Sequence, residues 1–149
     1  MSIHQDITGG SPSRKAIWFA RIAVAIVFFL NVMCAVQFVT WPESYAPSYG
    51  LPPTPESYAM VAGLGVAFLM WNVTYPAVIA SPTRFRALFV VVLCQQLIGL
   101  VGESWILWQL VGAGLGGSLM AGGILRFIIF DAGGLVLMLA AFIMLQLRK

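Results

Sequence analysis

The chain has 149 residues, of which 60% are hydrophobic and only 9% are charged, and its formal net charge is +3. Soluble domains carry about 25% charged residues, so this composition excludes an ordinary soluble domain and indicates an integral membrane protein. The positive charge does not predict a nucleic-acid partner, because the basic residues follow the ends of apolar segments instead of forming one patch.

Four long apolar segments follow one another, at residues 16–39, 58–80, 87–108 and 124–147. Each approaches or exceeds the roughly 20 residues with which a helix crosses a hydrocarbon core. Transmembrane strands would instead alternate between apolar and polar residues over about 10 positions. We therefore predict an all-α, four-helix transmembrane bundle over residues 16–149, preceded by a mobile cytoplasmic tail at residues 1–15.

The basic residues predict the orientation of this bundle. Seven of the eight lie before or early in the first segment, between the second and third, or at the C-terminus: Arg14, Lys15, Arg21, Arg84, Arg86, Arg148 and Lys149. By the positive-inside rule, both termini are predicted to be cytoplasmic. The first segment is longer than the apolar core of a signal peptide, so we expect it to be retained. The expected location is the bacterial cytoplasmic (inner) membrane, with several passes.

The two predicted external connections differ in character. The pentapeptide PESYA occurs at residues 42–46 and again at 55–59. Thr54 and Pro55 are typical of a helix start, so the second copy is predicted to begin a span, and the first to begin a short interfacial helix. Residues 109–123 contain six glycines, and a formal GxGxxG motif there lacks the preceding strand of a nucleotide-binding unit. This second connection is predicted to be a flexible loop or gate.

Polar residues inside the spans provide the candidate site. At 1.5 Å per residue, Asn31, Glu103 and Asp131 lie roughly 20 to 24 Å from the cytoplasmic face, and therefore in one layer toward the outer surface. Arg126 lies about one and a half turns further out and has a side chain long enough to bend toward the carboxylates. A second set, Asn72, Gln95 and Gln96, is predicted nearer the middle of the membrane, where it forms interhelical hydrogen bonds.

The polar layer allows three interpretations. It is a salt-bridged structural clasp, a pocket for a small ligand such as a quinone, or a relay for protons or ions. The only histidine, His4, lies in the tail, so we expect no histidine-based metal or haem site in the bundle. We also expect no catalytic set and no resident cofactor, because neither a Ser/His/Asp set nor a CxxC motif occurs in the bundle segments.

Three sequence features together resemble the small bacterial four-helix membrane proteins of the DoxX-like type. They are RIAVAIVFFLNVMCAVQF, the PESYA entry to the second span, and RFIIFDAGGLVLML. The resemblance implies a membrane subunit that works beside redox enzymes and quinones.

We therefore expect a non-catalytic subunit or a small-ligand or quinone-binding component. Its partners would be the lipid bilayer and either a membrane redox or transport protein or a second copy of the chain. One alternative is an oligomeric transporter or channel that uses the carboxylates of Glu103 and Asp131. Another is a membrane enzyme of quinone or lipid metabolism.

Overall fold

The computed structural model describes residues 12–147 and contains four helical segments long and apolar enough to cross a membrane. The helices are α1 (Arg14–Thr40), α2 (Pro42–Tyr45), η1 (Ala46–Tyr49), α3 (Pro55–Asn72), α4 (Tyr75–Ala80), α5 (Arg86–Gly112) and α6 (Leu119–Gln146). The second membrane-length segment consists of α3 and α4 together. No strand occurs within residues 12–147, so the predicted all-α fold with four spans is confirmed for this range, and it indicates a multi-pass membrane protein.

The first span begins where a side chain caps the helix. The Ser13 hydroxyl accepts a hydrogen bond from the Ala16 N–H at 3.2 Å, so α1 starts at Arg14, inside the predicted tail. Residues 1–11 of that tail, which include His4, lie outside the described part of the chain.

Both copies of PESYA begin helices, as predicted. The Thr54 side chain caps α3 by accepting from the Ser57 N–H, and Pro55 occupies the first turn. The first copy forms α2 and leads into η1, but the tyrosine of each packs inward: the rings of Tyr45 in α2 and Tyr49 in η1 lie 5.0 Å and 6.0 Å from the ring of Phe38. This contact links the external connection to the bundle.

The prediction of a long loop at residues 109–123 is wrong. Helix α5 continues to Gly112 and α6 already begins at Leu119, so only six residues connect them. Glycines are common in transmembrane helices, where neighbouring elements and the surrounding packing compensate for their low helix propensity. Gly114, with φ +77°, is the residue of this turn that requires the left-handed conformation.

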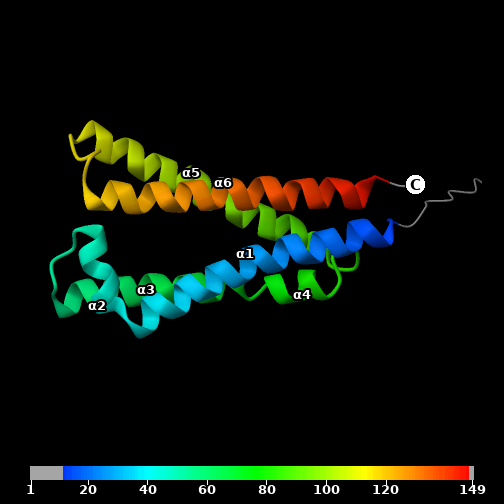
Figure 1. Cartoon of the computed structure of the whole chain (residues 1–149), viewed down its shortest axis with the longest axis horizontal. Helices are drawn as coiled ribbons and strands as arrows, with labels where there is room; N and C mark the ends of the chain where they lie inside the picture. The colour runs from blue at the N-terminus through cyan, green and yellow to red at the C-terminus, as the bar shows by residue number, and fades with distance from the viewer. Residues whose placement is uncertain (1–11, 148–149) are drawn as a thin grey trace, which may run out of the picture.

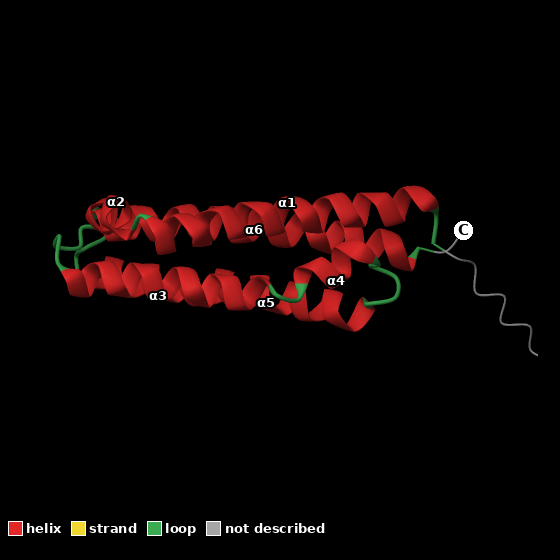
Figure 2. Ribbon diagram, turned by 90° about the horizontal axis from the view of Figure 1, so that it is seen from below, coloured by secondary structure: helices red, strands yellow, loops and turns green. Residues whose placement is uncertain are grey.

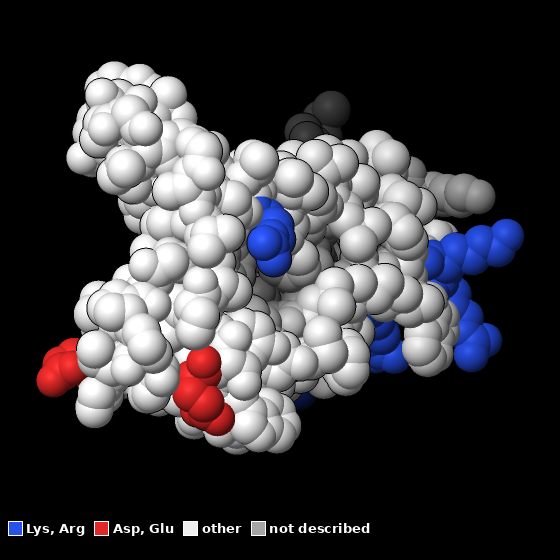
Figure 3. Space-filling view, turned by 60° about the vertical axis from the view of Figure 1, so that its left-hand side comes forward, with Lys and Arg blue, Asp and Glu red and all other residues white. Residues whose placement is uncertain are grey.

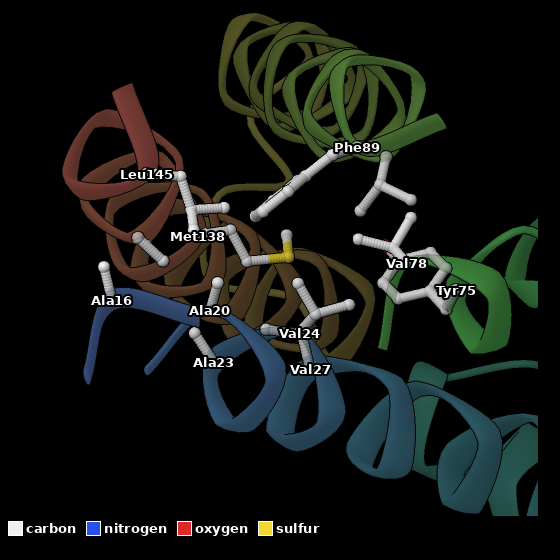
Figure 4. Packing of buried hydrophobic residues seen from close by; sticks show 12 residues of the cluster. Ala16, Ala20, Ala23, Val24, Val27, Tyr75, Val78, Phe89, Met138 and Leu145 are labelled. Carbon is white, nitrogen blue, oxygen red and sulfur yellow. The ribbon is translucent and has the colours of Figure 1, made fainter. Parts of the chain in front are cut away.

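The half of the bundle nearer the helix ends at Arg14 and Gln146 has a continuous apolar core. Figure 4 shows buried side chains from α1, α4, α5 and α6 meeting there, with Met138 between Phe89 and Val24. The second span is interrupted at residues 73–74, and the chain resumes as α4, which packs against both α1 and α5. This interruption closes that half of the bundle.

The other half of the bundle is less closed. Helix α3 packs against α1, and α5 packs against α6, whereas no extensive contact joins α3 to α5 or α6 in the described chain. Helices α1 and α3 approach closely at Gly65, where an added Cβ atom would lie 2.7 Å from the Ala35 carbonyl oxygen. Figure 1 shows α5 diverging from α3 toward the end where α2 lies, and in Figure 2 α3 and α5 overlap on the side opposite α1 and α6.

Charged residues separate along the bundle. In Figure 3 basic side chains gather at one end, two acidic groups lie toward the other, and the surface between them is largely uncharged. The start of α1 and the end of α6 lie at the same end of the bundle (Figure 1). There the Arg21 side chain donates a 2.7 Å hydrogen bond to the Ala80 carbonyl at the end of α4. An arginine near a helix C-terminus stabilises its unpaired carbonyl groups.

Candidate functional site

A small polar pocket of about 60 Å³ lies between the helices. It takes residues from all four membrane-length segments: Asn31, Phe68, Trp71, Asn72, Gln96, Gly99, Glu103, Phe127, Phe130 and Asp131. Its volume is enough for a few water molecules or a small chemical group. The structure thus brings three members of the predicted layer, Asn31, Glu103 and Asp131, to one pocket.

Gln96 is the centre of the hydrogen bonding around this pocket. Its side-chain Nε2 donates to Asp131 Oδ1 at 2.6 Å, and its Oε1 accepts from the Tyr75 hydroxyl at 3.3 Å. Both partners come from other helices, and Gln96 itself is only 2% exposed. The orientation of its amide is therefore set by a donor on one side and an acceptor on the other.

Glycines allow these polar groups to approach the helix backbones. A Cβ atom at Gly99 would collide with the Asp131 carboxyl group, which packs directly against α5 at this point. At Gly134 of α6, a Cβ atom would lie 3.0 Å from Gln96 Nε2. The hydrogen bond between α5 and α6 is thus accommodated by one small residue on each helix.

Two buried oxygen atoms at the pocket lack a hydrogen-bond partner: Asn72 Oδ1 and Glu103 Oε2. Asn72 is 3% exposed, and its Nδ2 donates to the Phe68 carbonyl at 2.8 Å, which leaves the oxygen unpaired. An unpaired buried oxygen costs about 1 to 3 kcal/mol, so most such atoms in proteins have a partner or bound water. The pocket therefore offers two acceptor positions to a molecule that enters it.

Arg126 does not belong to this pocket. It is an exposed residue of α6, and it lines neither the polar pocket nor the neighbouring cleft. Within residues 12–147, no basic group lies within the 4.0 Å ion-pair distance of Glu103 or Asp131. The Arg126 ion pair that one of the three interpretations, the structural clasp, requires is absent from residues 12–147.

The second predicted polar set divides between two environments. Gln95 lies outside the pocket, where its Nε2 donates to the Trp71 carbonyl at 3.4 Å and its Oε1 accepts from Thr74 at 3.3 Å. Asn72 and Gln96 line the pocket itself. Gln95 therefore holds the interrupted second span against α5, while its sequence neighbour organises the site.

An apolar cleft of about 560 Å³ adjoins the pocket, and three residues line both: Phe68, Glu103 and Phe127. The other lining residues are almost all apolar: Phe38, Tyr49, Leu51, Met60, Val61, Leu64, Ile106, Met120 and Ile124. They come mainly from α3, α5 and α6, across the opening where α3 and α5 diverge. This volume is within the usual range for small-molecule sites.

The aromatic side chains of the cleft are closely packed. The Phe68 and Phe127 rings lie 5.8 Å apart and nearly perpendicular, and Tyr49 stacks on Phe127 at 6.4 Å. Tyr49 lies in η1, between the spans, where burial raises its pKa to about 12. Its hydroxyl is therefore protonated at neutral pH and can donate a hydrogen bond.

The polar pocket lies nearer the middle of the helices than the predicted spans implied. Asp131 is twelve residues after the start of α6 and fifteen before its end, and Gln96 is ten residues into α5. The helices extend beyond the predicted spans at the end where α2 lies, so the layer falls near their middle. It is separated from that end by the apolar cleft.

The sequence did not predict Tyr75 or the apolar cleft, and it placed Gln96 in the second polar set instead of the layer. The spacing of Gln96, Gly99 and Glu103 by three and four residues already indicated one helix face, and it was the signal that could have joined Gln96 to the layer. Tyr75 and the apolar cleft had no comparable signal, because they depend on how the helices pack.

The residues present allow a limited chemistry. Two carboxyl groups, three amides and several aromatic rings can bind and orient a molecule. No group of three potential metal-ligating side chains occurs in the part of the chain that the structure describes. Comparison of the chain with protein-family models, with curated proteins and with solved structures finds no match.

Replacement of Gln96 tests the hydrogen bonding at the centre of the site. Gln96→Leu leaves the Tyr75 hydroxyl and Asp131 Oδ1 without partners in a buried environment, so we expect a loss of about 1 to 3 kcal/mol in unfolding free energy. Gln95→Leu is the matched control. Its bonds, at 3.3 and 3.4 Å, lack a short bond to a carboxyl group like that of Gln96, and its side chain is only half-buried, so the expected loss is below about 1 kcal/mol. Reversible unfolding in mixed micelles measures both, and equal losses would contradict the central role of Gln96.

Proposed function

We propose that this protein is a non-catalytic membrane component that binds a small amphiphilic molecule taken up from the bilayer. The polar head group of the molecule would occupy the pocket at Asn72, Glu103 and Asp131, and its hydrophobic part would occupy the cleft between α3 and α5. The observation that carries this proposal is that the two spaces are adjacent and share Phe68, Glu103 and Phe127 in their walls.

The arrangement of polar and apolar surfaces supports this function over a purely structural one. A structural clasp would pair its charges and fill its space, whereas here Asn72 Oδ1 and Glu103 Oε2 lack partners beside an open cleft. Keeping unpaired polar groups near the middle of a membrane is costly and is typical of a functional site. Quinones are one class of amphiphilic ligand, and the one that the DoxX-like resemblance implies.

The orientation proposed for the chain is that of an inner-membrane protein with both termini in the cytoplasm. It is supported by Arg14, Lys15, Arg21, Arg84 and Arg86, which lie at the end of the bundle where α1 begins. The cleft would then open toward the outer leaflet. A reporter enzyme that is active only in the cytoplasm should be active when it is fused after Lys149. Activity only from a reporter that requires the periplasm, fused at the same position, would contradict this orientation.

Retention of the bound molecule should depend on free space in the cleft. Leu64 lines the cleft, whereas Val66, two residues along the same helix, does not, although the two side chains are similarly exposed (43% and 47%). We expect wild-type protein and Val66→Trp to retain a hydrophobic small molecule through purification, at close to one per chain. Leu64→Trp should lose most of it, because the indole fills the same space. Mass spectrometry of solvent extracts from the three purified proteins measures this.

The thermal unfolding of both tryptophan variants controls for their folding. Loss of the molecule from Leu64→Trp alone, with similar unfolding temperatures, supports a ligand in the cleft. Equal retention by both variants, or recovery of ordinary phospholipid only, would contradict the proposed function.

A further inference from the structure

We infer that the head group bound in the polar pocket is the ammonium group of a membrane-soluble organic amine. This inference rests on the proposed function and specifies its ligand class. It follows from three features of the pocket: its carboxyl groups, its unpaired amide oxygen and its aromatic walls.

The first feature is the unbalanced charge of the acidic groups. Glu103 and Asp131 face one pocket from α5 and α6, and no basic group lies within ion-pair distance of either in the described part of the chain. Arg126, the only basic residue within the apolar part of α6, is exposed instead. Both carboxyl groups are half-buried. Their ionised forms are unfavourable there without a cation, so a bound cation would stabilise the ionised form of each.

The second feature is the direction of the amide groups. Asn72 lines the pocket and is 3% exposed; its Nδ2 donates to the Phe68 carbonyl, and its Oδ1 has no hydrogen-bond partner. Gln96 is already fixed between Tyr75 and Asp131. An ammonium group has three N–H donors and no acceptor, which suits Asn72 Oδ1 together with the Glu103 and Asp131 carboxyl groups.

The third feature is the surrounding rings. Phe68, Trp71, Phe127 and Phe130 line the pocket beside the carboxyl groups. Aromatic faces attract organic cations, and the attraction reaches about 2 kcal/mol where the cation is desolvated. The hydrocarbon part of the amine would extend from Phe68 and Phe127 into the apolar cleft.

The same features disfavour a head group that only accepts hydrogen bonds. Where Glu103 and Asp131 are ionised, the carbonyl oxygens of an oxidised quinone would face Asn72 Oδ1 and the carboxylate oxygens, and like partial charges at hydrogen-bonding distance repel, whereas an ammonium group is attracted. The pocket chemistry therefore favours an amine over the quinone that the family resemblance implies.

Paired probes of equal length test this inference. The full-length protein in phosphatidylcholine nanodiscs is titrated calorimetrically with n-octylamine and with 1-octanol, and titrations of empty discs are subtracted. We expect octylamine to bind at least about tenfold more tightly than octanol. Zwitterionic lipid is used because anionic lipid would itself attract the amine.

Amide variants locate the binding. Glu103→Gln and Asp131→Asn should each weaken octylamine binding by about tenfold or more and leave octanol binding nearly unchanged. Glu43→Gln is the matched control, because Glu43 is exposed in α2, and it should bind octylamine like the wild type. Glu103→Gln is the more informative variant, since Glu103 Oε2 has no hydrogen bond to lose.

The outcomes separate this inference from the proposed function. Equal affinities for octylamine and octanol would overturn the inference that the ligand is an amine. Octylamine binding that is unaffected by Glu103→Gln in a folded protein would overturn it as well. The proposed function would survive that result if a neutral molecule is still retained in a manner sensitive to Leu64→Trp. If neither probe binds and no molecule is retained, both proposals fail.

Discussion

Gln96 connects α4, α5 and α6 through two side-chain hydrogen bonds near the middle of the bundle. In a hydrocarbon environment, a polar side chain without a partner is costly, so this connection constrains the position of all three helices. It places the Asp131 carboxyl group against Gly99 and orients it toward the pocket. Gln96 is a neutral amide, so its hydrogen bond to Asp131 does not balance the charge of the nearby acidic groups when they are ionised.

The interruption of the second span gives the bundle two different halves. Helix α4 turns toward α1 and α5 and completes the apolar core in Figure 4, while α3 has extensive contact with α1 but not with α5 or α6. The chain therefore holds its polar pocket on a closed, well-packed base and leaves the cleft above it accessible between α3 and α5. A rigid base with an open side suits the capture of a molecule that already dissolves in the membrane.

The sequence was sufficient for features that depend on composition and on position along a helix. It predicted four spans, the start of α3 at Pro55 and the common level of Asn31, Glu103 and Asp131. Counting residues gives the position of a side chain along the helix axis but not its direction around that axis. For this reason Arg126 was wrongly assigned to the carboxylates. The glycines at residues 109–123 were interpreted as a loop, although most continue the helices. The cleft depends on which helices pair, and no single residue records that choice.

A crystal structure of the protein grown from lipid with an n-alkylamine tests the central claim most directly. The claim is that α3 and α5 stay apart around an amphiphilic molecule whose head group lies at Asn72, Glu103 and Asp131. The account predicts continuous density with its head at these three residues and its chain between α3 and α5. A structure in which α3 packs against α5 and Arg126 forms an ion pair with Glu103 would contradict it.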